Sequence, residues 1–251
     1  MKRTKIRFYL ERLLDLFGYQ VIIHKKISLT GDYSGSKFDR RYLERIVRKL
    51  DAWMQMSPKT LVEIGANLGQ DSAYLCNVWQ MSPQSVYCLE PIQRFAERIS
   101  NTYGFNAFEV AAFNVNGDTE FYSGYIDESS IANAGSSSLL RSESDYRYKK
   151  IQVKTIRMET WMQHNSVDEI DFLKIDAEGA SYEILEGFGS MIERVKVIQI
   201  ETERVPSWKN QKTERIVFEF LERSGFELLD YELGNPPTQA DSLWIRKGLL
   251  H

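Results

Sequence analysis

The segment from Leu61 to Asp71 constrains the fold of this chain more than any other part of its sequence. A short apolar run, Leu61–Ile64, leads directly into two closely spaced glycines, Gly65 and Gly69, and residues 72–79 then form an amphipathic pattern. This order predicts a buried parallel strand, a tight turn and the start of a helix. Glycines in such a turn let a ligand approach the backbone, and the helix N-terminus offers free N–H groups.

An acidic residue follows this turn at an informative distance. Glu90 ends the next apolar run, residues 85–89. An acid roughly 20 residues beyond the glycines is where nucleoside-binding βαβ units bind ribose hydroxyls. The dinucleotide pattern has glycines at its third and sixth positions, where this chain has Asn67 and Gln70. These residues favour a nucleoside-type cofactor without a pyrophosphate and leave a nicotinamide-dependent oxidoreductase as the alternative.

Four motifs occur in the order in which a known family carries them. Residues 63–69, 89–91, 135–139 and 171–179 resemble the successive motifs of the FkbM-type S-adenosylmethionine-dependent methyltransferases. The resemblance runs from about residue 61 to residue 201. It implies methyl transfer with S-adenosylmethionine as the cofactor, usually to oxygen, and often on sugars or other glycan and secondary-metabolite building blocks.

Strand and helix patterns alternate after residue 57. The expected strands are 61–64, 86–90, 107–111, 170–175, 195–200, 227–231 and 242–246, with an extended segment at 151–157. The expected helices are 72–79, 91–101, 159–163, 181–188 and 213–223. This alternation predicts a doubly wound, Rossmann-like α/β fold with helices on both faces of an open parallel sheet. The resemblance implies the seven-stranded sheet of class I methyltransferases, ending in a hairpin with an antiparallel last strand.

The N-terminal part is predicted to differ from the rest. We expect residues 1–56 to form a helical extension, with helices over 4–17 and 38–54, and residues 57–251 to form the methyltransferase domain. The first helix has one apolar face and basic opening residues. These features predict docking on the domain or on a partner copy in a homodimer, and permit weak contact with an anionic membrane surface.

Composition limits the remaining classes of function. The formal net charge of −3 argues against a general nucleic-acid binder, which usually carries a basic excess. Neither a membrane-spanning run nor a signal peptide is recognisable, so a cytoplasmic location is expected. Cys76 and Cys88 are expected in the core, without a disulfide or a zinc site.

The second informative segment is the apolar run 170–175, which ends in acidic residues. Alternation along a strand would place Lys174, Asp176 and Glu178 along one crevice at the carboxyl edge of the sheet. We assign Asp176 as the general base or acceptor-positioning group, Glu178 as the second choice and Lys174 as their catalytic neighbour. The alternative is a structural ion pair that caps the following helix. No metal ligand is assigned, although a divalent cation held by Asp176 with Glu201 or Glu178 would also assist deprotonation.

The cofactor and acceptor contacts follow from the positions of the motifs. The turn residues Gly65, Ala66, Asn67 and Gly69 would contact the methionine part, Glu90 the ribose, and Val110 and Ala111 the adenine. Glu63 would reach the amino group or serve as a paired structural acid. Ser136, Ser137 and Ser138 lie in an irregular stretch and would close over the cofactor or bind a polar acceptor, unless that stretch is a solvated linker.

A basic and aromatic cluster follows these serines. It contains Arg141, Tyr148 and Lys150, and it would hold a phosphate or nucleotide-sugar, or simply form a solvated face. We therefore predict O-methylation of a sugar, a nucleotide-sugar or a related small polar metabolite. The alternatives are a metal-assisted O-methyltransferase on the same fold and a non-catalytic cofactor-binding or interaction module.

Overall fold

The computed structural model describes residues 37–54, 58–124, 136–142, 148–234 and 237–249. The chain divides into two compact units, Met1–Ser34 and Gly35–His251, and all the elements below belong to the second. The helix predicted over residues 4–17, with its membrane or dimer contacts, lies outside the described residues.

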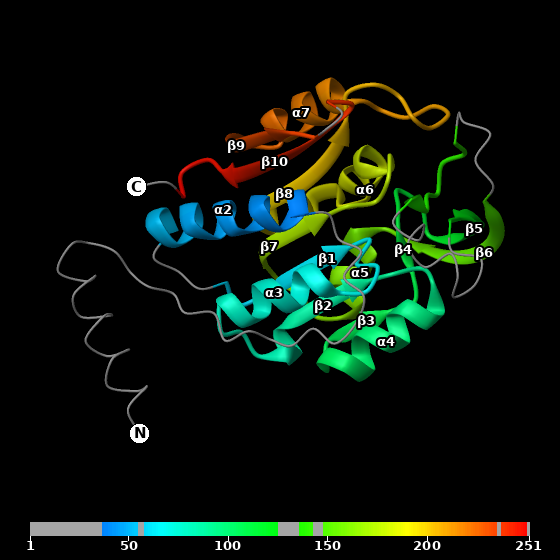
Figure 1. Cartoon of the computed structure of the whole chain (residues 1–251), viewed down its shortest axis with the longest axis horizontal. Helices are drawn as coiled ribbons and strands as arrows, with labels where there is room; N and C mark the ends of the chain where they lie inside the picture. Colours follow the sequence, from blue (N-terminus) through cyan, green and yellow to red (C-terminus); the bar gives the residue numbers. More distant parts are fainter. Residues whose placement is uncertain (1–36, 55–57, 125–135, 143–147, 235–236, 250–251) are drawn as a thin grey trace. The chain divides into compact units, whose positions relative to one another are not determined.

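A seven-stranded sheet forms the centre of the second unit (Figure 1), with the strand order β3-β2-β1-β7-β8-β10-β9. Its strands are β1 (Leu61–Ile64), β2 (Val86–Leu89), β3 (Asn106–Phe108), β7 (Ile170–Ile175), β8 (Val195–Glu203), β9 (Phe226–Leu233) and β10 (Gln239–Arg246). β10 runs antiparallel to both of its neighbours, while β3, β2, β1, β7 and β8 pair in parallel. This order confirms the predicted Rossmann-like sheet with an antiparallel last strand.

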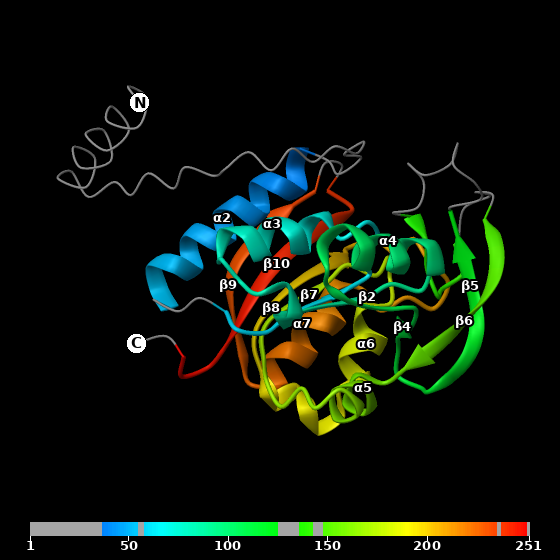
Figure 2. The same ribbon diagram turned by 90° about the horizontal axis from the view of Figure 1, so that it is seen from below.

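Helices cover both faces of the sheet (Figure 2). One face carries α2 (Lys37–Met54), α3 (Gln70–Val78) and α4 (Gln93–Tyr103), and the other carries α5 (Met158–His164), α6 (Ser181–Gly187) and α7 (Glu214–Arg223). Because side chains alternate along a strand, Leu61 packs in one buried cluster and Val62 in the other. The 3-10 helices Pro83–Ser85 and Gly189–Arg194 complete the helical elements of the described residues.

Helix α2 packs directly against the seven-stranded sheet. Its apolar face is buried with Leu61 and Phe172 in the cluster under this side of the sheet. Arg45 on α2 also forms an ion pair with Asp230 on β9, with a nitrogen–oxygen distance of 3.1 Å. Helix α2 therefore lies in the same compact unit as the sheet, Gly35–His251, and the domain boundary at residue 57 stays a prediction.

The structure also contains a second, three-stranded sheet, which the sequence did not predict. It has the order β4-β6-β5 and consists of β4 (Ala111–Ala112), β5 (Gly117–Ser123) and β6 (Lys149–Ile156). The strand predicted at 107–111 was wrong in its extent, because Val110 turns sharply and donates its N–H to the carbonyl of Phe108 at 2.9 Å. β5 was not predicted, since its first four residues are not buried and carry no apolar alternation. No helix in the described ranges has the length and apolarity needed to cross a membrane.

Candidate active site

The glycine turn between β1 and α3 is shaped by packing against its neighbours. Gly65 has a φ of +76°, and a Cβ there would overlap the backbone carbonyl oxygen of Asp176. A Cβ on Gly69 would lie 2.9 Å from Cγ1 of Ile99 on α4. The missing side chain of Gly65 thus gives space to the loop after β7, whereas the sequence interpretation gave that space to a ligand. Contact of this turn with a cofactor stays a prediction.

Asn67 and Glu90 meet at the adjacent ends of β1 and β2. Asn67 is in the left-handed region with a φ of +48°, and its N–H donates to Oε2 of Glu90 at 2.8 Å. Glu90 is 4% exposed, and its Oε1 accepts the N–H of Ile92 at 2.9 Å. Burial raises the pKa of Glu90 to about 8, although these two N–H groups act in the opposite direction. The side-chain oxygen of Asn67 is buried and has no hydrogen-bond partner among the described residues.

The backbone connects Glu90 with the predicted adenine-binding residues. The N–H groups of Glu90 and Val110 both donate to the carbonyl of Phe108, at 3.0 and 2.9 Å. Ala111 follows as a buried residue of β4. The structure thus brings Glu90 and Val110 together at the carboxyl ends of β2 and β3.

Lys174 is the centre of a buried ion cluster. Its Nζ lies 3.0 Å from Asp176, 3.1 Å from Asp71 and 3.3 Å from Glu63. Burial acts to lower the pKa of Lys174, but these three carboxylates outweigh it and hold the pKa well above its usual value. Lys174 therefore stays charged, and it holds Asp176 in place at the end of β7.

Glu63 has its partners inside the protein. It lies opposite Lys174 in the parallel pairing of β1 with β7. Its Oε2 also accepts the N–H of Ser72 at 3.1 Å and the hydroxyl of the same residue. Burial raises the pKa of Glu63 to about 7, while Lys174 acts to lower it. This geometry matches the paired structural acid of the two predicted roles.

Asp176, Glu178 and Glu201 form an acidic cluster at the ends of β7 and β8. Each offers a carboxylate oxygen, and these oxygens lie within 4.8 Å of one another. Burial, followed by the charge of Asp176, raises the pKa of Glu178 and of Glu201 well above the usual value. Such a cluster either shares protons or binds a hard cation.

The two predicted acceptor serines use their hydroxyls within the protein. Ser138 is 1% exposed, and its hydroxyl donates to the carbonyl of Glu178 at 2.6 Å and accepts the N–H of Leu140 at 2.9 Å. The hydroxyl of Ser137 accepts the N–H of Gly124 at 2.9 Å. Ser138 therefore links the second sheet to the loop that carries Glu178. A direct contact of either serine with the acceptor stays a prediction.

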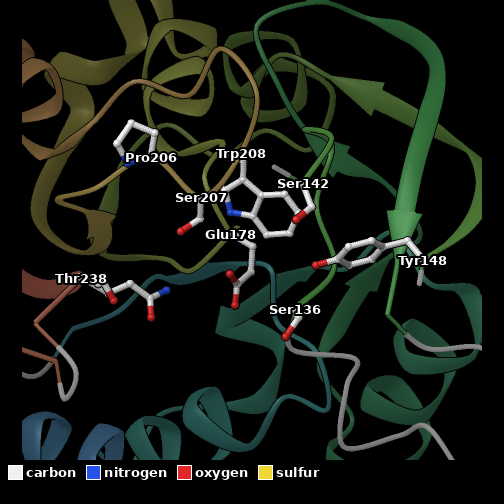
Figure 3. A pocket seen from close by; sticks show the side chains of 9 residues that line it. Ser136, Ser142, Tyr148, Glu178, Pro206, Ser207, Trp208 and Thr238 are labelled. Atoms are coloured by element: carbon white, nitrogen blue, oxygen red, sulfur yellow. The ribbon is translucent and has the colours of Figure 1, made fainter. Parts of the chain in front are cut away.

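A cavity of about 580 Å³ opens beside Glu178 (Figure 3). It is lined by Ser136, Ser142, Tyr148, Glu178, Pro206, Ser207, Trp208, Thr238 and Gln239. Sequence reasoning singled out Ser136, Glu178 and Tyr148 among these as functional candidates. It missed Trp208. The position of this residue could have indicated it, because the loop after the strand 195–200 lies at the ligand-binding edge of such a sheet.

The chain is similar to several known methyltransferases. The chain is 23% identical over 197 residues to the 2-O-methyltransferase NoeI of Sinorhizobium fredii (strain NBRC 101917 / NGR234), covering 74% of this chain and 79% of NoeI. A crystal structure of methyltransferase FkbM from Methylobacillus flagellatus KT is 14% identical, with a TM-score of 0.49 over 75% of this chain and 44% of the other. Magnesium protoporphyrin IX methyltransferase (ChlM) from Synechocystis PCC 6803 is 9% identical, with a TM-score of 0.48 over 98% of both chains.

The family model described as the methyltransferase FkbM domain matches residues 63–228. This range is well over half of the chain, and it spans the glycine turn, Glu90, the Lys174 cluster and most of the cavity wall. It decides between methyl transfer and the hydride transfer that the glycine spacing had left open. The chain belongs to the FkbM family of methyltransferases.

Proposed function

We propose that this enzyme transfers the methyl group of S-adenosylmethionine to a hydroxyl oxygen of a sugar, a nucleotide-sugar or a related small polar metabolite. The observation that carries the proposal is the contact between the glycine turn and the acidic loop. Gly65 lies against the carbonyl of Asp176, whose own N–H donates to Ile64 at 3.0 Å. A cofactor on the turn and an acceptor beside the loop would therefore be neighbours.

The residues at the turn fit the cofactor. The carboxyl group of Glu90 accepts one N–H at each oxygen, and a carboxyl group has further lone pairs that ribose hydroxyls would use. The buried, unpaired side-chain oxygen of Asn67 is an acceptor of the kind that a cofactor amino or hydroxyl group satisfies. Gly65, Ala66 and Gly69 would complete the turn around the methionine part.

Asp176 is the group best suited to take the proton of the acceptor hydroxyl. When bound, S-adenosylmethionine supplies an electrophilic methyl group, to which the acceptor oxygen bonds as the carbon–sulfur bond breaks. Lys174 stays charged and cannot accept a proton, but it orients Asp176 from 3.0 Å. Burial, followed by the charge of Asp176, raises the pKa of Glu178 well above the usual value, which favours the protonated form and suits a hydrogen-bond donor better than a base.

Calorimetric titration and a methyl-transfer assay test the two halves of this proposal separately. Wild-type protein should bind S-adenosylmethionine and S-adenosylhomocysteine and not NADH, whereas Glu90→Ala should lose most of that binding. Asp176→Asn should keep the binding and lose most methyl transfer. Glu97→Ala, on the exposed side of α4, is the control that should change neither. Tight NADH binding, or full activity of Asp176→Asn, would contradict the proposal.

The acidic cluster favours a second candidate, a metal-assisted O-methyltransferase on the same fold. Asp176, Glu178 and Glu201 would supply carboxylate oxygens of the kind that Mg²⁺ and Ca²⁺ prefer. In this version a cation, and not Asp176 alone, would lower the pKa of the acceptor hydroxyl. Activity that is lost with EDTA and restored by Mg²⁺ would favour this version, and activity unchanged by EDTA would exclude it.

A further inference from the structure

The chemical character of the residues that line the cavity indicates the charge of the acceptor that it would bind. Four of its residues present hydroxyl groups, namely Ser136, Ser142, Ser207 and Thr238, and Gln239 presents an amide. Trp208 and Tyr148 supply aromatic rings whose centroids are 5.8 Å apart. Glu178 is the only ionisable acid or base among the described lining residues apart from the Tyr148 phenol. The described wall therefore offers hydroxyls, an amide, aromatic rings and an acid, but no cation.

A phosphate group would have poor partners in this wall. Proteins bind phosphates mainly through Arg, Lys or the N-terminus of a helix. Glu178 belongs instead to an acidic cluster, in which its carboxylate oxygen and those of Asp176 and Glu201 lie within 4.8 Å of one another. A bound phosphate would add a further negative charge to this cluster, and Coulomb repulsion would weaken its binding.

Among the described residues, the cationic members of the predicted phosphate-binding cluster, Arg141, Lys149 and Lys150, do not line the cavity. Lys150 is exposed and pairs with Glu120 on β5 at 2.9 Å. Arg141 and Lys209 flank the lining residues Ser142 and Trp208 in the chain, and both are exposed rather than part of the wall. Tyr148 alone of the cluster residues named above faces the cavity (Figure 3).

Trp208 is a fixed element of this wall. It is 4% exposed, and a Cβ on Gly179 would overlap its indole ring, so the absence of a side chain there lets the ring lie against the loop after β7. Burial raises the pKa of the nearby Glu203 to about 7, and the indole N–H acts against this increase, but the N–H has no partner in hydrogen-bond geometry among the described residues. A buried donor of this kind is satisfied by a ligand oxygen or by water.

From this wall we propose that the acceptor is an uncharged glycosyl unit, free of phosphate and nucleotide groups. Its C–H face would pack against Trp208 and Tyr148, and its hydroxyls would bind the Ser, Thr and Gln side chains of the wall. The inference rests on the proposed function and narrows it, because it excludes the nucleotide-sugars and sugar phosphates among the candidates. The cavity volume of about 580 Å³ lies within the usual range for small-molecule sites.

Saturation-transfer NMR on the full chain with S-adenosylhomocysteine tests the inference. The probes are methyl glycosides of common hexoses and 6-deoxyhexoses, each matched with its 1-phosphate and its nucleoside-diphosphate ester. We expect saturation of ring C–H protons for at least one neutral glycoside and binding of its phosphorylated partners that is weaker by about tenfold or more. Tighter binding of a phosphorylated partner, or silence of every neutral glycoside, overturns the inference.

Matched variants test whether glycoside binding depends on the residues of the cavity wall. Trp208→Leu should weaken glycoside binding by about tenfold, as loss of a buried aromatic anchor does, while Trp208→Phe keeps the ring and should retain part of the affinity. Thr238→Lys should place a cation in the wall and strengthen binding of the 1-phosphate. Arg141→Gln and Lys150→Gln lie outside the wall and should alter neither ligand. Loss of phosphate binding in these last two variants would contradict the assignment.

The cofactor titration separates this inference from the function on which it rests. If S-adenosylmethionine binds and no neutral glycoside does, the inference fails while the methyltransferase proposal stands. If neither binds, both fail together. Unchanged cofactor affinity in Trp208→Leu, with lost glycoside binding, would support both and show that the variant is folded.

Discussion

Replacement of Glu90 by Gln should change how the stability of the protein depends on pH. Burial raises the pKa of Glu90 to about 8 from an ordinary value of 4.5. An acid with a raised folded-state pKa costs nothing below pH 4.5, where it is protonated in both states, and destabilises the fold increasingly as the pH rises to 8. At about 1.4 kcal/mol per pH unit, the interval from 4.5 to about 8 amounts to roughly 5 kcal/mol.

Glutamine at position 90 removes the pH-dependent cost of ionising a buried carboxyl group, but it introduces a loss of stability that is the same at every pH. Its amide has a single acceptor oxygen, so only one of the N–H groups of Asn67 and Ile92 keeps its partner. The unpaired N–H costs about 1–3 kcal/mol at every pH. Glu90→Gln should therefore be less stable than wild type at pH 5, and more stable than wild type above pH 8 by about 2–4 kcal/mol.

Urea unfolding followed by circular dichroism measures this difference in the cofactor-free protein. Both proteins should be compared at several pH values between 5 and 8.5, with Glu97→Gln as the exposed control that should follow wild type. The decisive feature is that the difference in unfolding free energy between Glu90→Gln and wild type changes sign between low and high pH. Stability curves that run parallel over this range would show that the carboxyl group of Glu90 is not held neutral by burial, and would refute the reasoning.

The remaining predictions concern the loop after β7 and the turn beside it. Lys174→Met should lower the unfolding free energy by about 3–5 kcal/mol, because it leaves buried acids without their cation, and urea titration would show it. Ser138→Ala should cost about 1–3 kcal/mol and lower kcat without altering cofactor affinity, because the Glu178 carbonyl loses its donor. Gly65→Ala should reduce the folded yield, whereas Gly104→Ala, with a similar φ of +71° but only an ordinary contact with Cβ of Pro83 at 3.9 Å, should cost only about 1–2 kcal/mol in thermal unfolding.

Much of the fold could be predicted because its strands are buried on both faces. The runs Leu61–Ile64 and Ile170–Ile175 are continuous apolar segments except for a polar residue or two, and each forms a strand with the predicted bounds. The placement of Glu90 and Asp176 at strand ends followed from the same pattern. Strand ends of a parallel sheet share one edge, so those two acids were expected near one site.

The features of the fold and the candidate site that could not be predicted depend on contacts between segments far apart in the sequence. Asp71 reads as a first-turn helix acid, and only the approach of β7 beside β1 makes it a partner of Lys174. The role of Gly65 is likewise set by a carbonyl more than a hundred residues away. Trp208 lies in a loop whose position depends on the small residue at Gly179. A sequence shows residue types and local periodicity, but not which loops will meet.

The contact of Gly65 with the loop after β7 has a consequence for how such enzymes diversify. Changes at this junction would disturb the glycine turn and the acidic loop together, so we expect the two to vary as one block. Apart from Glu178, the wall of the cavity is formed by the loops around Ser136, Trp208 and Thr238 and by Tyr148, which lie outside this block. New acceptors should therefore be reachable by exchanging those loops alone, and libraries for altered specificity are best confined to them.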